Sequence, residues 1–335
     1  MSLNKTCQFR IFVLMLTSFC AVVNAETTDV TVYPMPESKA QPIIDNIKGA
    51  KHTIDLSVYE LSDDRVIDAL AESARNSVAV RVMLEPKTVG GHAGGADATV
   101  SKLKAAGAEV EDTPPKFDSS NNVDHAKFMI IDHKVLLFGT GNLVKTGLGG
   151  GTEYNNRDFW VVDKRASAVK EADKVFAADW QRVTPTPFFL NLIVTPENAS
   201  ERILKLIDNA KTTLYIYNQE MFDSNVIDHI IKAKQRNVDT QVILANPPKF
   251  FHEKPSSDKN AKAIKKFSEA GIQGLESTNL YVHAKVIVSD DYVFFGSQNF
   301  SSGGLEKNRE LGEIFHEPAI AEQVIEVFKK DMQAK

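Results

Sequence analysis

Residues 125–132 read His-Ala-Lys-Phe-Met-Ile-Ile-Asp, and residues 283–290 read His-Ala-Lys-Val-Ile-Val-Ser-Asp. Each copy is a short run of apolar and β-branched residues that begins with a histidine and a lysine. Such a run is typical of a buried strand, and side chains two positions apart on a strand project from the same face. We therefore expect His125 to project together with Lys127, and His283 with Lys285.

The aspartate that closes each copy has a different geometry. Asp132 and Asp290 lie an odd number of residues from the histidine and lysine, near the end of the expected strand. Their side chains should point away from that pair. We predict that both are structural and bind backbone groups or a neighbouring loop.

Both copies are followed by the same polar signals. Residues 139–142 (Gly-Thr-Gly-Asn) and 296–299 (Gly-Ser-Gln-Asn) are turns of small residues that can bring amide donors near an oxyanion. Carboxylates then come in residues 156–158 (Asn-Arg-Asp) and 308–310 (Asn-Arg-Glu). One His-x-Lys alone indicates little, because most isolated histidines on strands are not catalytic. Two full copies make the pattern specific, and its candidate residues here are Thr140, Asn142, Asp158, Ser297, Asn299 and Glu310.

The repetition extends well beyond these motifs. Residues 53–60 reappear as 213–220, and the offset of 160 residues holds without a gap from Pro36, which matches Pro196, to residues 81–84, which match 241–244. The sequence therefore predicts two similar domains, residues 26–184 and 185–335, joined near the Thr-Pro-Thr-Pro segment 184–187.

Each half alternates strand and helix patterns. Dense apolar runs predict strands over residues 53–60 and 78–84, and over 213–220 and 238–244. Helical spacing follows over 63–76 and 97–106, and over 223–237 and 259–270. This alternation favours an α/β fold, with each half an α/β/α sandwich whose sheet is mixed and mostly parallel.

The N-terminus is typical of a secretory signal peptide. Lys5 and Arg10 precede an apolar run over residues 11–23, and small residues allow cleavage between Ala25 and Glu26. A retained membrane anchor is the alternative, but the run is short for a span. We predict that residues 1–25 are removed and that the protein is secreted or periplasmic.

Removal of that peptide changes the composition of the chain. Both cysteines, Cys7 and Cys20, leave with it, so we expect no disulfide. The net charge of −5 becomes −7 when two basic residues are lost. An acidic chain argues against a broad electrostatic grip on nucleic acid, although a local basic cleft is compatible with it.

Both halves resemble the phospholipase D superfamily, in which two His-x-Lys-x4-Asp motifs meet across a pseudo-twofold axis. The resemblance covers nearly the whole chain after residue 25, and both copies match the motif. It implies that one histidine attacks phosphorus to form a phosphohistidine, while the other protonates the leaving oxygen and then activates water. His125 and His283 would be this pair, and the near-symmetry of the halves gives little reason to prefer either as nucleophile.

The resemblance also assigns the surrounding residues. Lys127 and Lys285 would stabilise phosphate charge, Asn142 and Asn299 would donate hydrogen bonds, and the carboxylates of residues 158 and 310 would hold the second histidine nitrogens. The first half has Asp158 where the second half has Glu310. The shorter aspartate would need its backbone to lie closer to the histidine. The motifs contain no cluster of ligands at metal spacing, so we expect no cofactor for catalysis, although a divalent cation at a lipid interface is compatible with this chemistry.

The substrate is the least determined feature. Loops 85–96 and 246–258 follow corresponding strands, and the carboxyl ends of strands usually line the ligand site. Lys249, Phe250 and Phe251 are candidates for the substrate rim, meeting a lipid interface or a nucleobase; the alternative is that these aromatic residues anchor the core or the loop.

Three functions remain open from the sequence. The acidic charge and the expected secretion favour a phospholipase D that hydrolyses head groups at a phospholipid membrane and could also transfer the phosphatidyl group to an alcohol. The compact size favours a sequence-nonspecific endonuclease, whose substrate would be nucleic acid. A noncatalytic phosphate-binding protein would require a lost catalytic residue, and none is lost. Since one chain carries both motifs, we expect a monomer.

Overall fold

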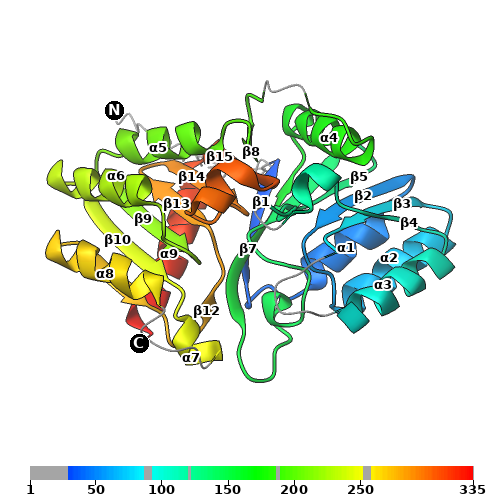
Figure 1. Ribbon diagram of the computed structural model, residues 1–335, viewed down its shortest axis with the longest axis horizontal. Coiled ribbons are helices and arrows are strands. Elements are labelled where there is room, and N and C mark those ends of the chain that lie inside the picture. The colour runs from blue at the N-terminus through cyan, green and yellow to red at the C-terminus, as the bar shows by residue number, and fades with distance from the viewer. Residues whose placement is uncertain (1–28, 87–92, 120–121, 186–188, 252–257, 335) are drawn as a thin grey trace, which may run out of the picture.

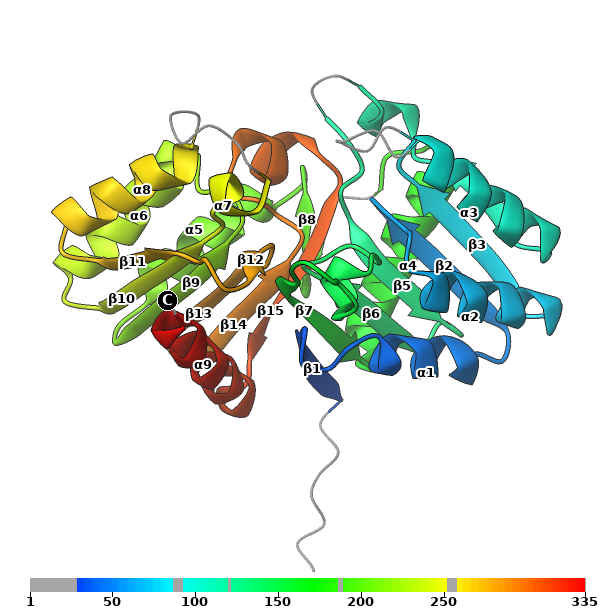
Figure 2. The same ribbon diagram turned by 90° about the horizontal axis from the view of Figure 1, so that it is seen from below.

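The computed structural model describes residues 29–86, 93–119, 122–185, 189–251 and 258–334. The predicted signal peptide, residues 1–25, lies outside the described residues. The described part of the chain forms two halves of the same construction, placed side by side (Figures 1 and 2). No helix in that part is long and apolar enough to cross a membrane.

The first half contains seven strands and four helices in its described residues. The strands are β1 (Val30–Met35), β2 (Thr53–Val58), β3 (Ala79–Leu84), β4 (Glu109–Asp112), β5 (Lys127–Ile131), β6 (Val135–Gly139) and β7 (Asn156–Asp163). The helices are α1 (Gln41–Gly49), α2 (Asp64–Arg75), α3 (Ala93–Ala105) and α4 (Ala166–Trp180).

The second half repeats this plan with two additions, β12 and α7. The strands are β8 (Leu192–Thr195), β9 (Thr213–Asn218), β10 (Asp239–Leu244), β11 (Gln273–Glu276), β12 (Tyr281–Val282), β13 (Val286–Ser289), β14 (Tyr292–Gly296) and β15 (Glu310–His316). The helices are α5 (Ala199–Asn209), α6 (Ser224–Gln235), α7 (Pro247–Phe251), α8 (Lys259–Glu269) and α9 (Pro318–Gln333).

The predicted helices and strands form close to their expected bounds, for local reasons. Asp63 and Asp223 each accept a hydrogen bond from a backbone N–H of the first helical turn, which fixes the start of α2 and α6. Asp258 does the same for α8. The predicted boundary between the halves falls on the connection from α4 to β8, of which residues 186–188 lie outside the described residues.

The two sheets share one strand order. The first runs β1-β7-β6-β5-β2-β3-β4, and the second runs β8-β15-β14-β13-β9-β10-β11. The α/β class and the two similar domains are confirmed. The expectation of mostly parallel sheets is wrong, because along the two strand orders only β2, β3 and β4, and likewise β9, β10 and β11, pair in parallel; β12, off this path, also pairs in parallel with β7. Short turns join β5 to β6 and β13 to β14, and a short turn can join only antiparallel neighbours.

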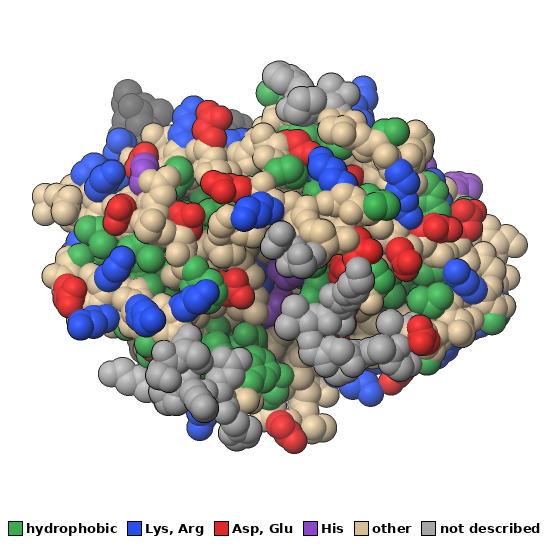
Figure 3. Space-filling model, viewed as in Figure 1, with side chains coloured by type: hydrophobic (Ala, Val, Ile, Leu, Met, Phe, Trp, Pro, Cys, Tyr) green, Lys and Arg blue, Asp and Glu red, His purple; other side chains and the backbone are tan. Residues whose placement is uncertain are grey.

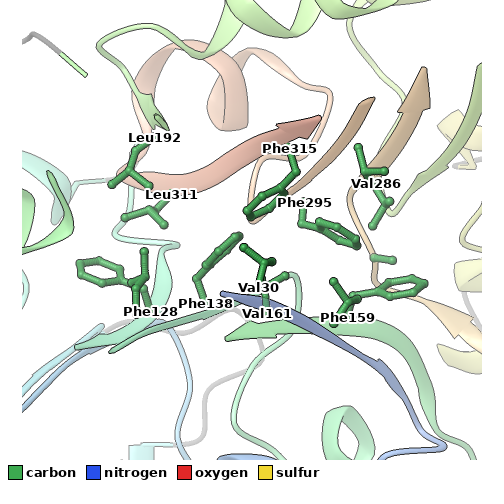
Figure 4. Packing of buried hydrophobic residues seen from close by; sticks show 14 of the residues in the cluster. Val30, Phe128, Phe138, Phe159, Val161, Leu192, Val286, Phe295, Leu311 and Phe315 are labelled. Carbon is green, nitrogen blue, oxygen red and sulfur yellow. The ribbon is translucent and has the colours of Figure 1, made fainter. Parts of the chain in front are cut away.

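Three hydrophobic cores hold the molecule together. Helices α1 and α2 cover the outer face of the first sheet, and α5, α6 and α8 cover that of the second. The third core lies between the halves, where both inner faces meet with α4 and α9. Figure 4 shows its aromatic rings facing each other across the junction, with Phe138 of β6 6.2 Å from Phe315 of β15 between ring centroids. The halves are thus packed as one body.

Candidate active site

Each motif histidine lies just before its strand, on a segment that bonds to the opposite half. The His283 N–H donates to the carbonyl of Arg157 over 3.1 Å, where β12 pairs with β7. Reciprocally, the His125 N–H donates to the carbonyl of Arg309 over 2.9 Å. Backbone hydrogen bonds across the junction therefore bring the two histidine segments to one place.

The predicted carboxylates hold the histidines of the other half. Nδ1 of His125 lies 2.9 and 3.1 Å from the two carboxylate oxygens of Glu310, and Nδ1 of His283 lies 3.1 Å from Oδ1 of Asp158. A carboxylate on Nδ1 favours the tautomer with its proton there and leaves Nε2 with a free lone pair. Each half-site is completed by the other half of the chain.

The backbones pair more extensively on the side of the shorter Asp158. Tyr281 and Val282 form a two-residue ladder with Asn156 and Arg157, whereas Asp124 and Arg309 make only an isolated bridge on the other side. The difference in side-chain length between the halves thus coincides with a difference in strand pairing.

The two lysines lie deep in the site with unequal partners. Each Nζ donates to the backbone carbonyl of the histidine two residues earlier. Lys285 also donates to Oε1 of Gln219 over 2.8 Å and to the carbonyl of Thr140 over 3.4 Å. Lys127 instead has its Nζ 5.3 Å from the ring centroid of Tyr59, the residue that stands where the second half has Gln219. The half-sites therefore differ beside their lysines.

Burial sets the ionisation of these groups. It lowers the pKa of His125 to about 4, against the opposing effect of Glu310, and it lowers the pKa of His283. Burial also lowers the pKa of Lys285 to about 8, and it lowers that of Lys127 well below its ordinary value. At neutral pH the free site therefore has two neutral imidazoles and at least one ammonium group.

The carboxylates stay ionised in this environment. Burial raises the pKa of Asp158, but His283, Lys285 and Thr140 together outweigh it and lower the pKa below its ordinary value. The pKa of Glu310 is lowered in the same way, chiefly by His125. Both carboxylates can thus balance an imidazolium when one forms.

The turns after β6 and β14 support the carboxylates and present amides. Thr140 Oγ1 donates to Oδ1 of Asp158 over 2.7 Å. Ser297 contributes a side-chain hydrogen bond that lowers the pKa of Glu310. Among the described residues, Oδ1 of Asn142 and Oδ1 of Asn299 are buried without a hydrogen-bond partner. An amide oxygen accepts hydrogen bonds, so these atoms can meet a donor such as a hydroxyl or a water, whereas only the amide nitrogens could donate to a phosphate oxygen.

One glycine in the first turn is required by this arrangement. A Cβ at Gly141 would lie 2.3 Å from Oδ2 of Asp158, too close for any side chain. The residue of the second half that corresponds to Gly141 is Gln298. The carboxylate of that half is the longer Glu310. The glycine thus makes room for a carboxylate that must sit closer to the backbone.

The two motif aspartates lie away from the histidines, at the far end of their strands. Asp132 accepts hydrogen bonds from the backbone N–H groups of residues 51–53, at 2.7 to 3.2 Å. Asp290 accepts from those of residues 211–213, at 2.8 to 2.9 Å. These bonds tie the end of β5 to the start of β2, and the end of β13 to the start of β9.

Two of the three expected rim residues contact Tyr281, which lies next to His283. Phe250 and Phe251 of α7 join Tyr154 and Tyr281 in an aromatic cluster, here called the aromatic wall, with ring centroids 4.8 to 6.3 Å apart. Tyr281 in turn lies 6.4 Å from the ring of His283. Lys249 is exposed on the same short helix.

Sequence reasoning missed two buried arginine clusters next to the carboxylates. Arg157 donates to Glu37 of its own half and to Asp331 of α9, at 2.6 to 2.9 Å. Arg309 donates to Glu197 of its own half and to Asp179 of α4, at 2.8 and 3.1 Å. The sequence did contain a signal for these clusters: the repeat that matches Pro36 with Pro196 also matches Glu37 with Glu197.

One group of metal-ligand type occurs in the described part of the chain. Ligand atoms of Asp55, His133 and Asp173 lie within 4.8 Å of one another. His133 follows Asp132, so the group is at the end of β5 away from the catalytic histidines. Asp55 already accepts two 2.7 Å hydrogen bonds from Arg81, whose positive charge opposes a cation there.

Comparisons with known proteins agree with this geometry. A family described as "Cardiolipin synthase, PLD-like domain" matches residues 43–180 and 203–332. The chain is 23% identical over 346 residues to a cardiolipin synthase of Clostridium perfringens (strain SM101 / Type A), covering 92% of this chain and 71% of that protein. It is 24% identical to the major cardiolipin synthase ClsA of Bacillus subtilis (strain 168), covering 92% of this chain and 70% of that protein.

A solved structure shows the same fold. Phosphatidylserine synthase of Haemophilus influenzae Rd KW20 superposes with a TM-score of 0.70 at 13% identity, over 91% of this chain and 86% of that one. At this identity the likeness concerns the fold alone.

The relatives correct the functional expectation. They are cardiolipin synthases, so the prediction of a phospholipase D that releases head groups is wrong, and so is the nuclease alternative. The reason is chemical: the histidine and lysine motifs specify phosphoryl exchange but say nothing about which alcohol enters or leaves. The chain belongs to the cardiolipin synthase, PLD-like domain family and is an enzyme of the phospholipase D superfamily in its single-chain, duplicated form, with phosphodiester chemistry.

Proposed function

We propose that this protein is a phosphatidyltransferase that moves a phosphatidyl group from one phospholipid to the hydroxyl of another, as in cardiolipin synthesis. The observation that carries the proposal is the pair of histidines at the junction, each held at Nδ1 by a carboxylate of the opposite half. The named relatives favour transfer over hydrolysis.

The first step exchanges the head group for a histidine. Nε2 of one histidine attacks phosphorus and a P–N bond forms, while the P–O bond to the leaving alcohol breaks. The other histidine gives that oxygen its proton, so it must enter the step as an imidazolium. An anionic phosphodiester bound between the two rings would raise the pKa of that imidazole and supply this form.

The second step reverses the roles. The hydroxyl of the acceptor lipid gives its proton to the second histidine and attacks phosphorus, and the P–N bond breaks. No water is consumed, and the first histidine returns to its neutral form. Lys127, Lys285, Asn142 and Asn299 would meet the charge that grows on the equatorial oxygens. His283 is buried and the side chain of His125 is only 12% exposed, which supports transfer because it restricts access of water to the intermediate.

The test compares the products formed from one substrate. Phosphatidylglycerol incubated with the purified protein should give cardiolipin and free glycerol, identified by mass spectrometry. Formation of phosphatidic acid alone would contradict the proposal. His125→Ala and His283→Ala should each lower the rate by about 10³-fold or more, since each residue acts in both steps.

We also propose the cellular setting and cofactor use that the sequence suggests. The chain would act outside the cytoplasm after cleavage near Ala25, and mass spectrometry of the exported protein should then find Glu26 at the N-terminus. Catalysis would proceed without a metal ion, so transfer from lipid in detergent should survive EDTA. Loss of that activity with restoration by a divalent cation would contradict this part.

A further inference from the structure

Two exposed phenylalanines lie at the edge of the second sheet that carries His283. The side chains of Phe222 and Phe251 are 36% and 43% exposed. They follow β9 and β10, which are parallel and paired up to Asn218 and Leu244, so both residues lie beyond the same edge. β13 runs antiparallel to β9, and His283 therefore precedes β13 at that edge as well.

The aromatic wall joins one of these residues to the catalytic centre. The ring of Phe251 lies 4.8 Å from that of Tyr281 and 5.9 Å from that of Tyr154, and Tyr281 lies 6.4 Å from His283. Figure 3 shows the molecule from outside, with histidine atoms at the bottom of a hollow between the halves and a hydrophobic area beside it over the second half. An apolar path thus leads from the surface to the site.

Lysines accompany both exposed phenylalanines. Nζ of Lys259 lies 4.8 Å from the ring centroid of Phe222, and Lys249 is exposed two residues before Phe251. Aromatic rings beside ammonium groups suit the surface of a bilayer, where rings enter among the head groups and cations meet phosphates. The positive charge of these lysines is a local feature, since the chain as a whole is acidic.

We propose that Phe222, Phe251, Lys249 and Lys259 form a docking surface for a phospholipid bilayer. The two phenylalanines enter the bilayer surface, the two lysines contact lipid phosphates, and a lipid reaches His283 along the aromatic wall. This inference rests on the proposed function, because it takes the substrate to be a membrane phospholipid.

The experiment measures binding to vesicles separately from turnover. Wild-type protein, Phe251→Ser, Phe222→Ser and the double variant are sedimented with phosphatidylglycerol vesicles over a range of lipid concentrations. Each single change should weaken binding by about tenfold, since each removes one apolar ring from the interface, and the double variant should lose more. Tyr292→Ser is the matched control, because Tyr292 is 45% exposed at the start of β14, the opposite end of the sheet. Its binding should equal that of the wild type.

The outcomes separate the two proposals. Wild-type affinity in both phenylalanine variants, or an equal loss in Tyr292→Ser, would overturn the docking surface. So would a wild-type protein that makes cardiolipin from lipid in detergent but fails to bind vesicles. Vesicle binding that depends on Phe222 and Phe251, without any transfer activity, would support the docking surface and overturn the proposed function. Thermal unfolding of each variant is measured as the check that its fold is intact.

Discussion

At the residue scale, the site consists of two similar but unequal halves. His125 is held by both oxygens of Glu310, whereas His283 meets one oxygen of Asp158. Tyr59 lies against His125, with ring centroids 5.0 Å apart, while the corresponding Gln219 binds Lys285. The general chemistry needs one histidine to attack while the other donates, so unequal surroundings are what two different roles require.

The orienting carboxylates give the first prediction. Glu310→Gln keeps the size of the side chain but removes its charge and can donate to Nδ1, which favours the wrong tautomer of His125. We expect transfer to fall by about 10²- to 10⁴-fold, and Asp158→Asn to act likewise on His283. Rates of lipid transfer at fixed protein concentration check this. Glu306→Gln, an exposed change on the same segment, should keep the wild-type rate, and an unaffected Glu310→Gln enzyme would contradict the orienting role.

The ionisation of the site predicts a pH profile with two limbs. The pKa of His125 is lowered to about 4 by burial, so falling pH protonates it only near that value and then blocks attack at Nε2. The pKa of Lys285 is lowered to about 8 by burial, so rising pH removes its charge above that value. With His125 as the attacking histidine, kcat/KM should fall below about pH 4; it should also fall as rising pH removes first the proton of the general-acid histidine and then, above about pH 8, the charge of Lys285. In Lys285→Arg the guanidinium stays protonated, so any remaining activity should lack the break near pH 8 and keep the fall that depends on the histidine.

At the element scale, the histidine segments are fixed by strands of the opposite half. β7 carries Asp158 and pairs with β12, which leads into His283. β15 carries Glu310, and the residue before it, Arg309, exchanges backbone hydrogen bonds with residues 123 and 125. Arg157 and Arg309 anchor these segments through buried ion pairs to both halves. The element that positions a catalytic residue is therefore also part of the junction.

Breaking one arginine cluster tests this coupling. Arg309→Met leaves the buried Asp179 and Glu197 without their cation, which should lower the free energy of unfolding by about 3–5 kcal/mol. Urea denaturation followed by circular dichroism measures this. Lys48→Met is the control, since Lys48 pairs with Glu72 on the surface and both side chains are 55% exposed. This change should lower the free energy of unfolding by less than about 1 kcal/mol. Equal losses for the two variants would contradict an essential anchoring role.

At the scale of the whole molecule, one chain contains every part of the site. The central core joins the inner faces of both sheets, and the carboxylates cross that junction in both directions. Each histidine of the described site therefore finds its carboxylate within the same chain. This arrangement supports the expectation that the protein is a monomer, which stays a prediction.

Mixing two inactive variants checks that prediction. His125→Ala and His283→Ala proteins, unfolded together and refolded as a mixture, should remain inactive, because each chain builds its site from its own two halves. Recovery of about a quarter of wild-type activity or more would indicate halves exchanged between chains, as in domain swapping. Size-exclusion chromatography of the refolded wild type provides the control.

The sequence by itself determined the duplication, the α/β class and the identity of the motif side chains. These follow from local rules, because strand periodicity and helix caps depend on residues only a few positions apart. The antiparallel half of each sheet was predictable in principle from the short turns at residues 132–134 and 290–291, a signal weaker than the strand–helix alternation.

Only the tertiary structure decided which carboxylate serves which histidine. His125 and Glu310 are 185 residues apart, and His283 and Asp158 are 125 apart, each pair crossing between the halves. The aromatic wall likewise takes Tyr154 from the first half and its other three rings from the second. Such pairings depend on how the two sheets pack face to face, and no local pattern in the sequence records that packing.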